Sequence, residues 1–117
     1  MKCRIILELL AILFFTGCYN REQISRLDEA EALIQNKPDS ALTILQQLKS
    51  EGSQAEQARY ALLYSEALDK NHIKATNDSL IRRAWEYYKH HPKDLRRQCK
   101  TLYYWGKVKL RAGDKPG

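Results

Sequence analysis

The sequence predicts an all-α fold built from stacked antiparallel helix hairpins. Apolar residues recur at helical spacing through residues 24–114, and no stretch keeps the apolar–polar alternation of a strand. Residues 39–42 (DSAL) align with residues 78–81 (DSLI) at an offset of 39 residues. Because a repeat of this length is typical of helical solenoids, we expect about two and a half hairpins, with a non-repetitive α-bundle as the alternative.

The first three helices are predicted from their apolar faces and from the breaks between them. The first spans about 22–36 and ends before Pro38, because the residue that precedes a proline disfavours the helical conformation. The second spans about 40–50, with Asp39 as its N-terminal cap. The third spans about 54–70 and is apolar around much of its circumference, so we expect it to pack between neighbours on two sides.

The last two helices follow a polar loop. The fourth spans about 79–90, with Asp78 as its cap, and stops at Pro92. The fifth spans about 93–112. We expect Cys99 to be a small core residue of this helix and not a reactive thiol. The predicted core face consists of residues at helical spacing: Leu95, Cys99, Leu102, Trp105, Gly106 and Leu110.

The N-terminus has the three parts of a secretory signal. Lys2 and Arg4 supply positive charge, residues 5–15 form the apolar stretch, and residues 16–17 are small. The apolar stretch is shorter than the roughly 20 residues that a membrane-spanning helix needs. A plain signal peptide and a buried N-terminal helix are both possible, and the residue that follows, Cys18, favours a third interpretation.

Residues 15–18 (FTGC) resemble the lipobox of bacterial lipoproteins, with Phe in place of the usual Leu. The resemblance implies cleavage directly before Cys18 and a diacylglycerol, of the palmitate type, on its thiol. Residues 1–17 would then be the signal peptide and residues 18–23 a lipidated linker. Two acyl chains suffice for stable anchoring. We expect a cell-envelope protein, by default on the periplasmic face of the outer membrane, with the inner membrane left open.

The helical region resembles tetratricopeptide-repeat (TPR) proteins, in particular bacterial lipoproteins of that family. Residues 102–109 (LYYWGKVK) fit the first-helix motif large-x2-Leu-Gly-x2-Tyr, except that Lys109 replaces an aromatic residue. Residues 80–92 keep the spacing of the second-helix motif with the residue sizes exchanged. The resemblance covers residues 24–114 and leaves residues 115–117 as a truncated tail. Because the last motif is a first helix, we expect an N-terminal piece of a longer protein or a truncated product.

The TPR resemblance also implies a peptide-binding groove lined by the first helix of each pair. Three cations and two aromatic side chains would suit an acidic, extended peptide. In the alternative, a following helix covers the tyrosines and the cations are merely solvated. The residues that the fifth helix would contribute are Lys100, Tyr103, Tyr104, Lys107 and Arg111.

Charge is distributed unevenly along the chain. The net charge is +6, and residues 80–117 hold 11 Lys or Arg against 3 Asp or Glu. Such an asymmetry can mark a basic contact surface, or simply a solvated face. For an exported lipoprotein we expect an anionic protein, peptide or lipid headgroup as partner, and no nucleic acid.

The sequence holds none of the catalytic or nucleotide-binding motifs HExxH, GxSxG, CxxC, P-loop or dinucleotide fingerprint. His90 and His91 diverge by about 100° on a helix, so we interpret them as helix-end cations and not as metal ligands. The carboxylates Glu29, Glu31 and Glu66 fall on polar faces, where we expect solvation. We therefore predict no enzymatic activity, no cofactor and no metal.

These observations favour a lipid-anchored TPR-like scaffold that mediates protein–protein interaction in the bacterial cell envelope. One alternative is the input domain of a membrane-associated regulatory protein whose output module is missing from this chain. A third interpretation is the helical arm of a lipoprotein that captures nutrients or glycans.

Overall fold

The computed structural model describes residues 21–75 and 77–111, and every regular element in these residues is a helix. Residues 21–33 are helical. The later helices are α2 (Pro38–Gln47), α3 (Gln54–Lys70), α4 (Ser79–Tyr88) and α5 (Leu95–Arg111). This confirms the all-α class. The predicted signal peptide (1–17), Cys18 and the tail (115–117) lie outside the described residues, as do residues 112–114 of the predicted repeat domain.

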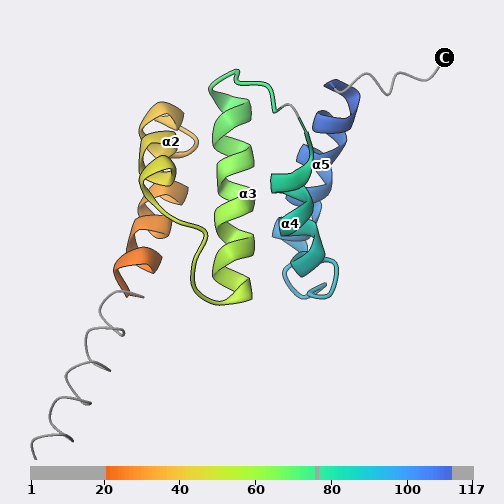
Figure 1. The fold of residues 1–117 in the computed structure, drawn as a ribbon, viewed down its shortest axis with the longest axis horizontal. Coiled ribbons are helices and arrows are strands. Elements are labelled where there is room, and N and C mark those ends of the chain that lie inside the picture. The colour runs from red at the N-terminus through yellow and green to blue at the C-terminus, as the bar shows by residue number, and fades with distance from the viewer. Residues whose placement is uncertain (1–20, 76, 112–117) are drawn as a thin grey trace, which may run out of the picture.

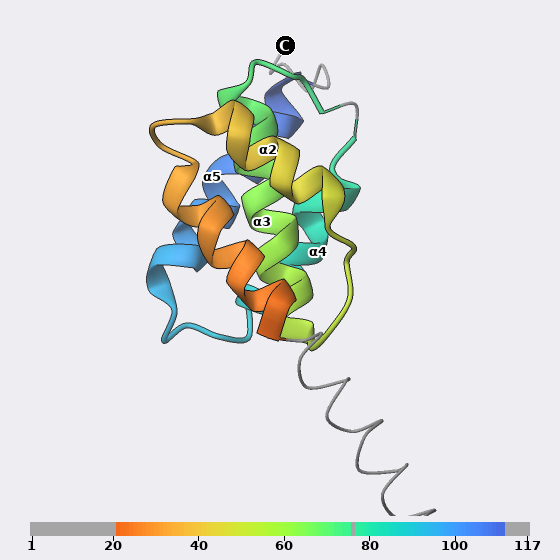
Figure 2. The same ribbon diagram turned by 90° about the vertical axis from the view of Figure 1, so that its left-hand side faces the viewer.

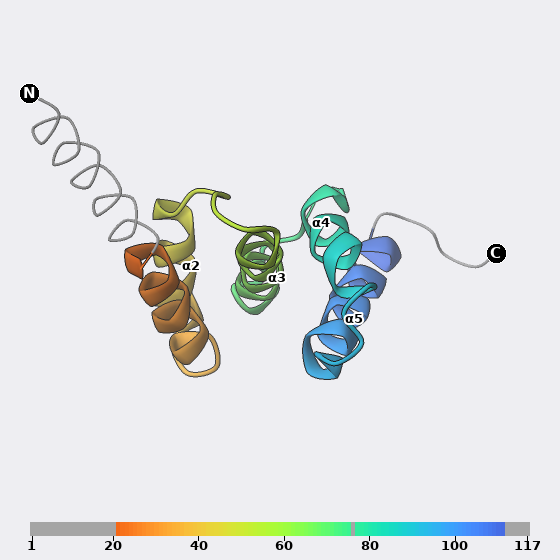
Figure 3. The same cartoon turned by 90° about the horizontal axis from the view of Figure 1, so that it is seen from below.

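Successive helices alternate in direction, and α3 lies in the middle of the molecule (Figure 1). Residues 21–33 and α2 cover one side of α3, and α4 and α5 cover the other side (Figure 3). Seen from the N-terminal side, residues 21–33 and α2 lie in front of α3 (Figure 2). The described helices therefore form layers along the longest axis of the molecule.

Two clusters of buried side chains hold these layers together, and α3 contributes to both. Tyr60, Leu63 and Ala67 belong to the cluster shared with residues 21–33 and α2. Ala58, Ala61 and Leu62 belong to the cluster shared with α4 and α5. The sequence-based prediction that this helix packs on two sides is confirmed. Burying a side chain of leucine size contributes roughly 1.5–3 kcal/mol, so both layers depend on α3.

The start of the first helix differs from the prediction. The helix was predicted from about residue 22 and the linker over residues 18–23, and residues 21–23 are already helical. Gln23 is 6% exposed, and its amide Nε2 donates hydrogen bonds to the carbonyl oxygens of Lys49 (2.9 Å) and Glu51 (3.1 Å). These carbonyls lie beyond the C-terminal end of α2, and the carbonyl of Lys49 also accepts a hydrogen bond from the N–H of Glu51 (2.8 Å). The side-chain amide of Gln23 adds two hydrogen bonds that tie the first helix to this segment.

The predicted cap of α2 is wrong by two residues. The helix begins at Pro38, and Lys37 occupies the cap position without a side-chain hydrogen bond. Proline is well suited to the first position of a helix, where its missing N–H has no partner to lose. Asp39 lies in the first turn, where its charge complements the helix dipole.

Asp78 does occupy the cap position of α4, but its side chain makes no capping hydrogen bond. Its carboxylate Oδ2 accepts hydrogen bonds from Arg82 Nη2 (2.8 Å) and from Trp105 Nε1 (3.0 Å). The residue therefore links the start of α4 to α5. These hydrogen bonds hold the pKa of Asp78 below its usual value.

The predicted core face of α5 is wrong except at Trp105, which is half-buried and packs against the cluster shared by α3, α4 and α5. Leu95, Leu102 and Leu110 are 61%, 47% and 62% exposed, and Cys99 is exposed. The helix buries its opposite side, which consists of Thr101, Tyr104 and Val108. Both sides are apolar, so periodicity alone could not select between them. The acidic residues of α3 make the difference, because they pair with cations that flank the buried side.

Candidate functional site

The predicted groove residues of α5 lie on the side that faces α3. Lys100 Nζ is 3.0 Å from Glu66 Oε2, and Lys107 Nζ is 3.0 Å from Asp69 Oδ2. Arg111 forms an ion pair with Asp69 as well. The three cations are therefore brought together as predicted, but each already has an acidic partner on α3. An anionic ligand would have to compete with these carboxylates.

The two tyrosines are placed differently from each other. Tyr103 is 57% exposed, and Lys107 Nζ lies 5.1 Å from the centre of its ring. Tyr104 is only 7% exposed, so its assignment to an open groove surface is wrong. Burial, with the charges of Glu66 and Asp69 nearby, raises the pKa of the Tyr104 hydroxyl. Tyr104 belongs to the core between α3 and α5, because it lies with Val108 on the side that α5 buries.

Further ion pairs extend this charged surface to the first helix. Arg59 of α3 contacts Asp28 at 2.6 Å and Glu31 at 2.5 Å. Arg97 of α5 lies 3.4 Å from the other carboxylate oxygen of Glu31. Burial raises the pKa of Glu31, but Arg59 and Arg97 outweigh it and hold the pKa below its usual value. Glu31 thus joins all three helices.

We call this set of charged residues the ion-pair ladder. It runs across residues 21–33, α3 and α5, and it links helices that are not adjacent in sequence. Its members are Asp28, Glu31, Arg59, Glu66, Asp69, Arg97, Lys100, Lys107 and Arg111.

Glu66 is the member that sequence reasoning placed wrongly. Its side chain is 1% exposed, not solvated. Gln35 Nε2 donates a hydrogen bond to Oε1 at 3.3 Å, while the contact between Lys100 and Oε2 is an ion pair without hydrogen-bond geometry. Glu66 follows Leu62 and Leu63 by one helical turn, and an acid within such an apolar face was the signal for a buried carboxylate.

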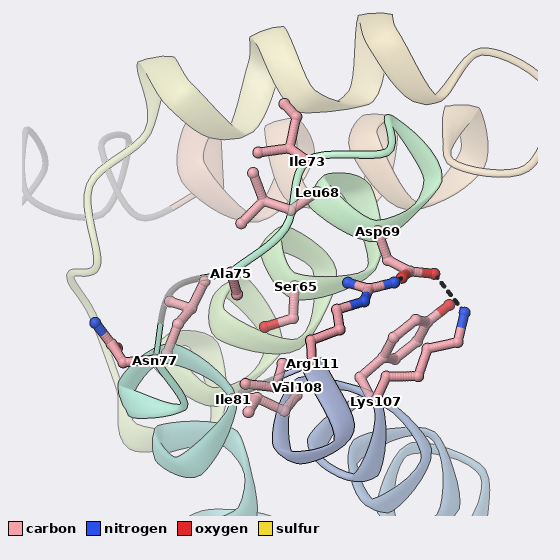
Figure 4. A pocket seen from close by; sticks show the side chains of 12 residues that line it. Ser65, Leu68, Asp69, Ile73, Ala75, Asn77, Ile81, Lys107, Val108 and Arg111 are labelled. Carbon is pink, nitrogen blue, oxygen red and sulfur yellow. Dashed lines mark hydrogen bonds and ion pairs between the residues drawn. The ribbon is translucent and has the colours of Figure 1, made fainter. Parts of the chain in front are cut away.

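Two small cavities accompany the ladder. One holds about 50 Å³ beside Arg59, Glu66 and Lys100. The other holds about 20 Å³ near the C-terminal ends of α3 and α5. Figure 4 shows Asp69 at its edge, with the side chains of Lys107 and Arg111 pointing toward it. Spaces of this size hold one or two waters, not an organic ligand. The ladder is therefore a surface and not a substrate pocket.

Asp69 is the most strongly paired acid at this edge. Burial raises its pKa, but the hydrogen bonds and charges of Lys107 and Arg111 outweigh that effect and hold the pKa below its usual value. The side chain of Asp69 is 14% exposed. Its charge therefore fixes both cations in place at neutral pH.

Across residues 21–75 and 77–111, no three His, Cys, Asp or Glu side chains gather closely enough to hold a metal ion. None of the described helices is both long enough and apolar enough to cross a membrane.

Comparison of the chain with protein-family models, with curated proteins and with solved structures finds no match.

Proposed function

We propose that this chain is a lipid-anchored scaffold of TPR-like helical hairpins that binds other proteins in the bacterial cell envelope. The observation that supports it best is the ion-pair ladder, because its ion pairs join residues 21–33, α3 and α5, which are alternate helices of the chain. Alternate helices that share a surface are what a stacked array of hairpins offers to a partner. The lipobox-like residues at Cys18 support the membrane anchor.

The partner that suits this surface is an acidic, extended segment of another protein. Lys107 and Arg111 would bind its carboxylates after exchange with Asp69, which holds both cations in the unbound protein. Charge-assisted hydrogen bonds of this kind are about twice as strong as neutral ones. Asp69 then competes with the acidic segment for Lys107 and Arg111, and variants of Asp69 can test the proposal.

The test compares variants of Asp69 and Lys107 for binding a fluorescent Glu-rich peptide. Asp69→Asn should strengthen binding several-fold, because the competitor is removed and both cations remain. Lys107→Glu should weaken it at least tenfold. Lys93→Glu, an exposed residue outside the ladder with the same change in charge, is the matched control and should have little effect. Weaker binding by Asp69→Asn, or equal loss with Lys93→Glu, would contradict the proposed surface.

The anchor is tested separately by the mass of the mature protein and by cell fractionation. The chain expressed in a Gram-negative bacterium should lose residues 1–17, gain a diacylglycerol and partition with membranes. Cys18→Ala should abolish all three effects without altering peptide binding. A parent chain whose mass shows an unmodified Cys18 would reject the lipid anchor.

A further inference from the structure

One side of α5 is apolar and faces away from the rest of the described structure. We call it the outer stripe: Leu95, Cys99, Leu102, Gly106 and Leu110. Among the described residues, six large apolar side chains are exposed, and four of them belong to α5: Leu95, Leu102, Tyr103 and Leu110. Exposed apolar residues scattered singly need no explanation, but a contiguous set marks an interaction site.

The spacing of the outer stripe is that of a helix–helix contact. Its members follow one another at intervals of four, three, four and four residues, which is the spacing of a coiled-coil seam. A shallow hollow opens on the stripe and is lined by Leu102, Trp105, Gly106 and Lys109. These four stand at i, i+3, i+4 and i+7. A helix receives the side chain of a neighbouring helix between four residues so arranged.

Gly106 places no side chain in this hollow. No atom lies within 4 Å of the position that a Cβ at Gly106 would take, so a larger residue there would fill open space. A partner residue of leucine size can enter in its place. The stripe spans most of a 17-residue helix, or about 25 Å, which matches about four to five turns of a partner helix.

The charges of α5 show which partners fit. The helix carries six Lys or Arg and no Asp or Glu. Four of these cations form ion pairs within the protein: Arg97, Lys100, Lys107 and Arg111. The other two, Arg96 and Lys109, are exposed and form no ion pair within residues 21–75 and 77–111. At roughly 100° per residue they lie on opposite sides of the outer stripe.

This arrangement disfavours a second copy of the chain. A second α5 carries no Asp or Glu, so in either orientation it would bring further cations, and no acid, to the flanks that hold Arg96 and Lys109. Like charges that flank a helix contact oppose association, and opposite charges select the partner. A membrane surface is disfavoured too, because only two of the six cations of α5 lack an ion pair within the described residues, and each would contribute about 1 kcal/mol toward anionic lipid.

We infer that the outer stripe docks an amphipathic helix of another protein, with apolar residues at the same spacing and Asp or Glu on both flanks. A side chain of leucine size enters the hollow at Gly106, and the flanking acids pair with Arg96 and Lys109. The outer stripe shares no residue with the ion-pair ladder. The inference can therefore be refuted or supported independently of the proposed function.

The test uses the purified full chain and two synthetic helical peptides of about 20 residues. Both carry leucine at the seam positions, one with Glu and the other with Lys on the flanks. The Glu peptide should bind at least tenfold more tightly than the Lys peptide, as measured by fluorescence anisotropy. The double variant Arg96→Glu with Lys109→Glu should reverse this preference, whereas Lys107→Glu should leave it intact. Equal binding of the two peptides would overturn the inference.

A pair of apolar variants locates the contact. Leu102→Asp should lower the affinity for the Glu peptide at least tenfold. Ile24→Asp, at an exposed apolar residue of the first helix, should leave it unchanged, and circular dichroism checks that both variants fold. If the chain dimerises and Leu102→Asp abolishes the dimer, the stripe is the contact with a second copy. If the chain binds anionic vesicles and Leu102→Asp abolishes that binding, the stripe is the contact with a membrane. Either result would overturn the inference.

Discussion

Replacing Lys100 by methionine would leave the buried carboxylate of Glu66 without its cation. The side chain of Glu66 is 1% exposed, and Lys100 Nζ lies 3.0 Å from it. Their attraction is about 5 to 6 kcal/mol at an effective dielectric constant of about 20, and desolvation of the carboxylate offsets much of it. Removing one partner of a buried pair costs about 3–5 kcal/mol. Because Lys100 is 26% exposed and water can approach, we expect about 3 kcal/mol.

A double-mutant cycle separates the lost pair from lost packing. Urea unfolding, followed by circular dichroism, would be measured for the parent chain, Lys100→Met, Glu66→Gln and the double variant. Glutamine is neutral and keeps an acceptor for Gln35. The double variant should therefore be more stable than Lys100→Met alone by about 2 kcal/mol. If Lys100→Met loses less than about 0.5 kcal/mol, or if the two changes simply add, then Glu66 is not a charged group that depends on Lys100.

Two further predictions concern the core and the pH dependence of stability. Leu45 is 0% exposed and Leu110 is 62% exposed, so Leu45→Ala should lower the free energy of unfolding by about 3–5 kcal/mol and Leu110→Ala by less than about 0.5 kcal/mol. Urea unfolding measures both free energies. Equal losses in the two variants would contradict the burial of Leu45. Because the folded-state pKa of Asp69 is lowered, its contribution is present above its unfolded pKa, near 3.8, and is lost as acidification proceeds through the lower folded pKa. Thermal unfolding of Asp69→Asn between pH 5 and 2 should therefore show a shallower loss of stability than the parent chain; equal slopes would contradict it.

The helices could be predicted from sequence because their signals are local. Pro38 and Pro92 break the pattern at places where the structure has turns, and α3 has its predicted bounds of 54–70. The packing of α3 on two sides could be predicted because apolar residues occupy much of its circumference, which is a property of the helix alone. The caps were predicted less well, because α2 begins at Pro38, before Asp39, and the carboxylate of Asp78 accepts hydrogen bonds from the side chains of Arg82 and Trp105.

The orientation of α5 and the burial of Glu66 could not be predicted from local pattern. α5 has two apolar sides, one with Tyr104 and Val108 and the other with Leu102 and Leu110, and helical periodicity ranks them about equally. The choice depends on which side places Lys100 beside Glu66, a residue 34 positions away. That distance information is absent from a single sequence without knowledge of how α3 and α5 pack.

The same ion pairs change the interpretation of the basic C-terminal third of the chain. Counted along the chain, residues 80–117 suggest a surface that attracts anions over long distances. In the structure four of the six cations of α5 form ion pairs with Glu31, Glu66 and Asp69. Only Arg96 and Lys109 remain beside the outer stripe, so long-range charge contributes little there. Recognition at this helix therefore rests on the spacing of apolar side chains, with the two remaining cations selecting among helices that fit.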